Sequence, residues 1–126
     1  METTKIHQVL AEVLKDEIEI LGSAKTEEII SRNLEGKPNK IFKSKHGSNI
    51  DFGSIVTIVS TSVTIFVFLS DLRNRNRYSK IDKMIGDFNM KFPDQAITEN
   101  KMKILFKTIS EKIDELKIKE NENKAE

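Results

Sequence analysis

The chain of 126 residues is long enough for one small domain, or for a small domain plus a membrane anchor. Its 21 basic residues nearly balance its 20 acidic residues, so it lacks the overall positive charge that is typical of nucleic-acid-binding proteins. Because it contains no cysteine, a disulfide framework, a thiolate metal site and a cysteine nucleophile are excluded, and the composition fits a reducing compartment.

Residues 1–35 are predicted to form a helical hairpin. Apolar residues recur at helical spacing in residues 6–21, and Gly22 is placed to end this first helix. A second helix is expected over residues 25–34, with an apolar edge that docks on the first. We interpret the hairpin as an interaction module, and His7 as a surface or boundary residue rather than a ligand.

Residues 36–49 are interpreted as a basic linker. Its Gly-Lys pair lacks the spacing and the following hydroxyl residue of a phosphate-binding loop. Its four lysines are expected either in a solvated loop or on anionic lipid headgroups. His46, Ser48 and Asp51 match a catalytic trio by identity alone, and such residues in a glycine-containing loop more often make a turn.

The sequence is dominated by residues 52–70, nineteen residues without a charge between Asp51 and Asp71. As a helix this stretch is about 28 Å long, close to the ~30 Å hydrocarbon core of a bilayer. Eleven of its residues are Ile, Val, Leu or Phe, which favour insertion by about 3 to 7 kcal/mol, and its Ser, Thr and Gly residues reduce that margin. Neither face of a strand would be uniformly apolar, so a helix is predicted. It is either a single transmembrane span or the buried core helix of a soluble protein.

The start of the chain lacks the basic and apolar regions of a secretory signal, so any membrane segment is expected to be internal. Small and hydroxyl residues fall on one side of the predicted apolar helix. Such a stripe lets a partner helix approach closely and predicts self-association in the membrane, or packing against another membrane protein. The alternative is that these residues are tolerated without a role. The residues assigned to helix packing are Gly53, Ser54, Thr57, Thr61 and Thr64.

Basic residues follow the apolar stretch. Together with Tyr78 they are interpreted as membrane-interface residues at headgroup level, and they slightly favour a cytoplasmic C-terminus. A nucleic-acid site is a weaker interpretation, because the patch contains a single aromatic residue. The residues assigned to this basic flank are Arg73, Arg75, Arg77 and Lys80.

A short strand is predicted after the basic flank. Phe88, Met90 and Phe92 alternate with polar residues, which indicates a half-buried strand over residues 87–92 that ends at Pro93.

A last helix is expected from about residue 98. Its apolar residues have four-three-four-three spacing, and Ile104 and Leu105 widen this seam into an ordinary amphipathic face. We expect this face to pack on its own domain, and residues 120–126 to form a flexible tail. The seam residues are Met102, Phe106, Ile109, Ile113 and Leu116.

The order of elements over residues 52–113 is an apolar helix that ends in a cluster of arginines, a predicted strand, a Pro93-Asp94 turn and a helix. This layout resembles the effector-associated constant component proteins of prokaryotic conflict systems. The resemblance implies a small accessory protein that partners an effector, such as a protease-like domain. The chain departs from the family's pattern at Leu69, where the family usually has an aromatic residue before the basic cluster.

No catalytic or metal-binding pattern is recognisable. The two histidines lie on separate segments, and no zinc-protease, nucleophile-elbow or glycine-rich phosphate motif occurs. We therefore expect no enzymatic activity, no cofactor, no metal and no small-molecule substrate.

The expected fold is mainly α with a minor β element (α+β), in which amphipathic helices flank one long apolar helix. The expected parts are the hairpin, the linker, the apolar helix with its basic flank (50–78), a strand-plus-helix segment (79–119) and the tail. The leading hypothesis is a bacterial, single-pass accessory protein of the cell membrane that contacts lipid and binds a protein partner or a second copy. One alternative is a cytoplasmic, soluble α+β interaction domain with residues 52–70 in its core. A further alternative is a holin-like pore lined by the same stripe.

Overall fold

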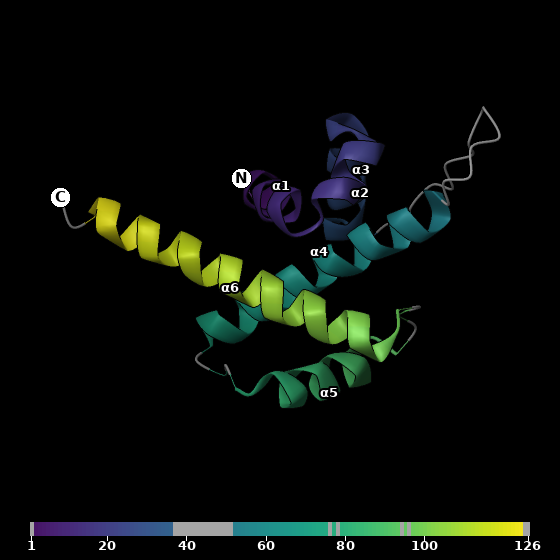
Figure 1. Ribbon diagram of the computed structural model, residues 1–126. Coiled ribbons are helices and arrows are strands. Elements are labelled where there is room, and N and C mark those ends of the chain that lie inside the picture. The colour runs from purple at the N-terminus through teal and green to yellow at the C-terminus, as the bar shows by residue number, and fades with distance from the viewer. Residues whose placement is uncertain are drawn as a thin grey trace. The chain divides into compact units, whose positions relative to one another are not determined.

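The computed structural model describes residues 2–36, 52–75, 77, 79–93, 95 and 97–124 (Figure 1). These residues form six helices and contain no strand. The chain divides into two units, Met1–Thr64 and Ile65–Glu126, and the long apolar helix contributes its first part to one unit and its second part to the other. The helices are α1 (Glu2–Val13), α2 (Lys15–Leu21), α3 (Ser23–Leu34), α4 (Phe52–Asn74), α5 (Ile81–Lys91) and α6 (Glu99–Lys124).

The first unit contains α1, α2, α3 and the first part of α4. Where the sequence predicted one helix over residues 6–21, the structure has two, because the backbone leaves helical geometry at Leu14 (φ −120°, ψ 49°). The amides of Leu14 and Ile18 still bond to the carbonyls of Leu10 and Leu14, at 2.7 and 2.9 Å, so the break is local. Gly22, at φ 86°, ends α2 in a conformation that glycine adopts without strain, and α3 begins at the next residue.

Helices α1, α2 and α3 pack on one another through their apolar sides. His7 on α1 is half-buried, and its Nδ1 lies 3.5 Å from Oε1 of Glu27 on α3. This contact makes His7 a boundary residue between two helices. The buried apolar residues of these three helices are Ile6, Val9, Leu10, Leu14, Ile18, Leu21, Ile29 and Ile30.

The second unit contains the last part of α4 together with α5 and α6, which lie side by side and run in opposite directions (Figure 1). Four of the five seam residues predicted for α6 are buried, and Leu116 is half-buried. Leu105 extends the buried face as predicted, whereas Ile104 points outward and is exposed. The backbone of α6 continues to Lys124, so the predicted end of this helix near residue 119 was too early.

The predicted β element is wrong. Residues 87–91 belong to α5, and the amide of Phe92 bonds to the carbonyl of Phe88 at 2.8 Å, as in a helix. The buried residues Met84, Ile85 and Phe88 define a helical face, whereas Met90, which the strand would have placed beside Phe88, is 84% exposed. The apparent alternation involved only three apolar residues, and burial of a helical face outweighed it. The described residues are therefore all-helical rather than α+β.

Helix α4 confirms the predicted helix over the apolar stretch and extends it to Asn74. At 23 residues it is about 34 Å long. Within the described residues, Gly53–Asn74 is the one helix long and apolar enough to cross a membrane, and the core helix of a soluble protein would satisfy the same criteria.

Candidate functional site

The stripe predicted for helix packing lies in two different environments along α4. Gly53 and Ser54, at its start, are exposed, and Thr57 is half-buried. Thr61 is only 2% exposed, and Thr64 is half-buried. Thr61 is therefore covered by the protein itself, whereas Gly53 and Ser54 are accessible.

Hydroxyl groups of α4 bond to the backbone of the same helix. Oγ1 of Thr57 donates to the carbonyl of Gly53 at 2.9 Å, and Oγ of Ser62 donates to the carbonyl of Ile58 at 2.8 Å. Oγ1 of Thr64 likewise lies 3.2 Å from the carbonyl of Ser60. Bonds to the carbonyl four residues earlier satisfy a hydroxyl without any partner outside the helix. These polar residues can therefore be accommodated in an apolar environment.

A polar cluster joins α3 to the middle of α4; we call it the Asn33 cluster, and it consists of Asn33, Ser60 and Thr64. Nδ2 of Asn33 lies 3.1 Å from the carbonyl oxygen of Ser60, from its Oγ and from Oγ1 of Thr64. The Thr64 hydroxyl is also 3.4 Å from Oδ1 of Asn33. The amide side chain thus ties α3 to two residues one turn apart on α4, so that part of the stripe packs against the chain's own helix.

The sequence prediction missed Asn33, although a signal was present. Asn33 follows Ile29 by four residues and Ile30 by three, and both isoleucines are buried. Residues at these spacings share a helical face, so Asn33 is a polar residue on an apolar edge. Such a residue needs a polar partner when its helix packs.

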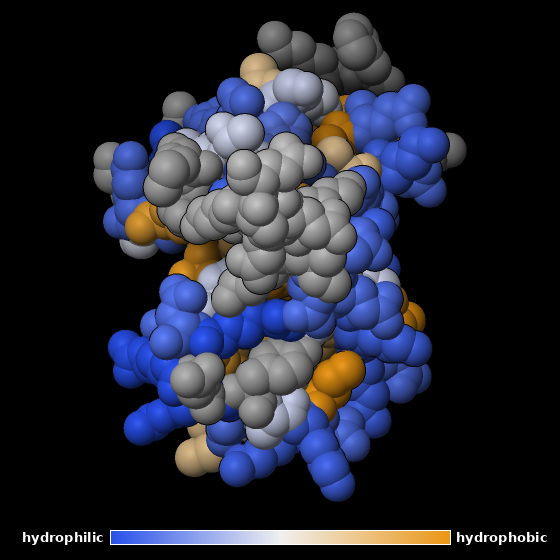
Figure 2. All heavy atoms as spheres, turned by 90° about the vertical axis from the view of Figure 1, so that its left-hand side faces the viewer, coloured by the Kyte–Doolittle hydropathy of each residue, from blue (hydrophilic) through white to orange (hydrophobic). Residues whose placement is uncertain are grey.

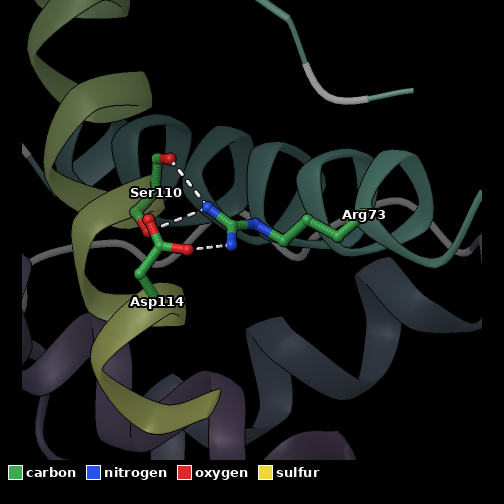
Figure 3. Close-up of polar contacts among 3 residues, drawn as sticks. All are labelled: Arg73, Ser110 and Asp114. Carbon is green, nitrogen blue, oxygen red and sulfur yellow. Dashed lines mark hydrogen bonds and ion pairs between the residues drawn. The ribbon is translucent and has the colours of Figure 1, made fainter. Parts of the chain in front are cut away.

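A second polar cluster lies in the second unit; we call it the Arg73 cluster, and it consists of Arg73, Ser110 and Asp114. The guanidinium of Arg73 reaches from α4 to two residues one turn apart on α6 (Figure 3). Nη2 lies 3.2 Å from the carbonyl oxygen of Ser110 and 3.0 Å from its Oγ, and Nη1 pairs with the carboxylate of Asp114. The Arg73 side chain is only 10% exposed, so the structure engages it within the chain.

The other members of the predicted basic flank are directed to solvent. Nε of Arg75 pairs with Oδ1 of Asp71 at 3.1 Å, one turn earlier on the same helix, and both side chains are accessible. Arg77 and Lys80 are exposed, and Lys80 immediately precedes α5. The four predicted residues therefore do not form one site: Arg73 binds α6, and the others remain on the surface.

Phenylalanines from α4, α5 and α6 form the core of the second unit. Phe88 is fully buried, and its ring centroid lies 5.4 Å from that of Phe68 on α4 and 5.3 Å from that of Phe106 on α6, both edge to face. Phe92 approaches Phe88 at 5.0 Å in a tilted arrangement. These contacts hold the end of α4 against α5 and α6 by apolar burial, beside the Arg73 cluster.

The described residues contain no group of three or more side chains suited to hold a metal ion. The predicted linker after Gly36, with His46 and Ser48, lies outside the part of the chain that the structure describes, as do Asp51 and Tyr78. The interpretations placed on those residues remain predictions.

The different burial of Thr57 and Thr61 within the stripe can be tested by substitution. Leucine in place of Thr61 should lower the free energy of unfolding by about 1–3 kcal/mol, because it adds volume at a buried position. The same change at the half-buried Thr57 should cost less than about 1 kcal/mol. Urea unfolding followed by circular dichroism compares the two; equal costs would mean that burial does not distinguish these positions.

Comparison of the chain with protein-family models, with curated proteins and with solved structures gave no match. The resemblance to effector-associated constant components therefore stays a prediction of layout, and the strand in that layout is helical here. The described residues belong to the all-helical class of folds. Their one apolar helix of membrane-spanning length, α4, makes polar contacts with α3 and α6.

Proposed function

We propose that this protein is a non-enzymatic helical accessory protein that binds a protein partner or a second copy, with α4 as its core helix. The observation that carries the proposal is the Asn33 cluster at the middle of α4. Helix α3 carries charged residues within two turns of Asn33, namely Glu27, Glu28 and Arg32. In a spanning α4 this contact would bring α3 to the middle of the hydrocarbon, where a charged residue costs about 2.5–3.5 kcal/mol.

Contacts at the other end of α4 support the same proposal. Phe68 packs against Phe106, and Arg73 bonds to Ser110 and Asp114, so α6 lies along the end of α4. Helix α6 carries several charged residues on its outward side, including exposed Lys103, Lys107 and Glu111. A helix of this kind faces water, which fits α4 as a core helix better than α4 as a lipid-facing span.

Outward-facing apolar side chains suggest where a partner would bind. Met90 and Ile104 are exposed. Met90 follows the buried Phe88 by two residues, and Ile104 precedes the buried Phe106 by two residues. Two residues turn a helix by about 200°, so these side chains lie opposite the phenylalanine core. On the face shown in Figure 2, the described surface is mainly hydrophilic and the hydrophobic residues form small patches. Small exposed apolar patches of this kind suit a contact of limited area with another protein.

The second candidate is a single-pass accessory protein of the cell membrane. It is supported by the length and apolar composition of Gly53–Asn74, and by the hydroxyls of α4 that bond to their own helix. A membrane location would also place the exposed Arg75 and Arg77 at the headgroups.

Val67→Lys separates the two candidates. Val67 is an exposed residue of α4, four residues beyond the buried Val63 at mid-helix. If α4 is a core helix, the variant should stay in the detergent-free soluble fraction, with its stability changed by less than about 0.5 kcal/mol. If α4 spans a bilayer, lysine within the apolar stretch should disfavour insertion, by less than the about 2.5–3.5 kcal/mol of a lysine at the helix centre, and shift protein out of the membrane fraction.

The matched control for this fractionation is Val67→Leu, which keeps the position apolar. The proposal expects wild type, Val67→Lys and Val67→Leu to behave alike. Wild-type protein that stays in membranes after washing with high salt and alkali, combined with loss of Val67→Lys from that fraction, would replace the proposed function with the second candidate.

A further inference from the structure

We infer that α4 is a conditional membrane segment: the chain covers it with α3 and α6, and it enters a lipid bilayer when the Asn33 and Arg73 clusters open. The inference rests on the proposed role of α4 as a core helix. It adds a partner, the hydrocarbon interior of a bilayer, and two contacts that control access to it.

The first argument is that backbone groups and several hydroxyl groups of α4 find their hydrogen-bond partners within the helix itself. It is long enough to cross the hydrocarbon core of a bilayer, since Gly53–Asn74 is a helix of 22 residues and its part over residues 53–70 carries no charge. Every backbone group inside such a helix is satisfied within the segment, which is the condition for lying in lipid. The hydroxyls of Thr57, Ser62 and Thr64 also bond to carbonyls of α4 itself. Separation from α3 would leave these bonds in place.

The second argument is that two localised polar clusters join α4 to other helices. In the first unit the described contact is the amide of Asn33 on Ser60 and Thr64, and in the second unit it is the guanidinium of Arg73 on Ser110 and Asp114. Each cluster ties α4 to one amphipathic helix. Loss of Asn33 on α3, or of Arg73 on α4, removes the side chain at the centre of its cluster.

The third argument is that the arginines at the end of α4 have a favourable environment when α4 lies in a bilayer. Arg73, Arg75 and Arg77 all follow the last uncharged residue of the stretch, Ser70. With α4 in a bilayer they would lie at the headgroups, where basic side chains are favoured on an anionic surface. Arg75 and Arg77 are already exposed. Opening the Arg73 cluster therefore transfers a buried guanidinium to a surface suited to it.

The experiment uses the full chain and two features of its composition, the absence of tryptophan and of cysteine. Val67→Trp places a single fluorophore at an exposed position of α4. Asn33→Cys and Ser60→Cys replace two side chains whose Nδ2 and Oγ atoms are 3.1 Å apart, and a short, reducible thiol cross-linker joins them in the folded protein. The probe is a vesicle of phosphatidylcholine and phosphatidylglycerol, with brominated acyl chains to quench tryptophan at hydrocarbon depth.

The cross-linked protein should show little quenching, because α3 stays tied to α4. Reduction frees α3 in a protein that already lacks the Asn33 side chain, and should increase the quenched, vesicle-bound fraction by about tenfold. Adding Arg73→Gln to the reduced protein should raise it further. Circular dichroism before mixing shows that the protein is folded in each state, so failure to fold is detected separately. Folded protein that remains unquenched after reduction in both backgrounds would overturn the inference.

Equal quenching in the two states would show that the proposed role of α4 as a core helix is wrong. If the cross-linked and reduced proteins are quenched equally, α4 lies in lipid whether or not it is tied to α3, and the contacts do not control access. That result overturns the inference as well, but together with membrane retention of the wild type it supports a permanent span. Quenching that depends on reduction supports both the core role of α4 and its release.

Discussion

Replacing Phe88 with alanine should lower the free energy of unfolding by about 3–5 kcal/mol, the loss expected when a fully buried phenylalanine is truncated. Phe88 is fully buried, and its ring lies at the centre of contacts with Phe68, Phe92 and Phe106 at 5.4, 5.0 and 5.3 Å. Alanine would remove the apolar area that these rings share and leave a cavity between α4, α5 and α6. Since small domains are stable by only about 5–15 kcal/mol, this change should be plainly visible.

The measurement is urea unfolding followed by circular dichroism, with Met90→Ala as the matched control on the same helix. Met90 is two residues from Phe88 but exposed, so its truncation should change stability by less than about 0.5 kcal/mol. A strand over residues 87–92 would instead place the two side chains on the same face. Equal losses for Phe88→Ala and Met90→Ala would therefore contradict the helical assignment of α5.

Long apolar patterns in the sequence predicted α4 and α6. The apolar stretch is bounded by charges at Asp51 and Asp71, and no strand register gave it a uniform face, so α4 was predictable. The apolar face of α6 repeats over several turns, and most of its residues are buried. In both cases the pattern is longer than any competing local signal.

Short patterns failed where tertiary burial decided the outcome. Three alternating apolar residues suggested a strand, yet Met84 and Ile85, one turn earlier, complete a helical face with Phe88. The break at Leu14 has no proline or glycine to announce it, and the amides around it keep their helical bonds. Propensity and spacing over five or six residues are weak constraints, and packing against α6 overrides them in α5.

The candidate site was predictable in part. Spacing alone grouped Thr57, Thr61 and Thr64 on one side of a helix. It did not show which residues would cover that side. At Thr64 the partner is Asn33, which is distant in sequence and polar on an otherwise apolar edge. Ser110 gives the same signal, since it lies between Phe106 and Ile113 on the buried face of α6 and is itself buried. Polar residues in apolar faces mark contacts, and the fold is needed to pair them.

Replacing Arg73 with alanine should lower the free energy of unfolding by about 1.5–3 kcal/mol, the loss expected for charge-assisted hydrogen bonds that are largely shielded from water. The guanidinium uses its two terminal nitrogens on different partners, Ser110 and Asp114. Arg73→Lys should recover less than half of the loss, because an ammonium group lacks the planar fork. Removal of Arg73 also takes away the charged donor that reaches the Ser110 hydroxyl and carbonyl.

The control for Arg73 is Arg75→Ala, two residues further along α4. Arg75 is 65% exposed and pairs with Asp71 one turn away, an arrangement that contributes only about 0.3–0.5 kcal/mol and weakens with salt. The loss for Arg73→Ala should persist in high salt, because the side chain is mostly buried. If both arginines served a membrane interface, neither substitution would change the stability of the protein in detergent-free buffer. A large, salt-resistant loss for Arg73 alone would thus separate the residue that binds α6 from the residue that faces solvent.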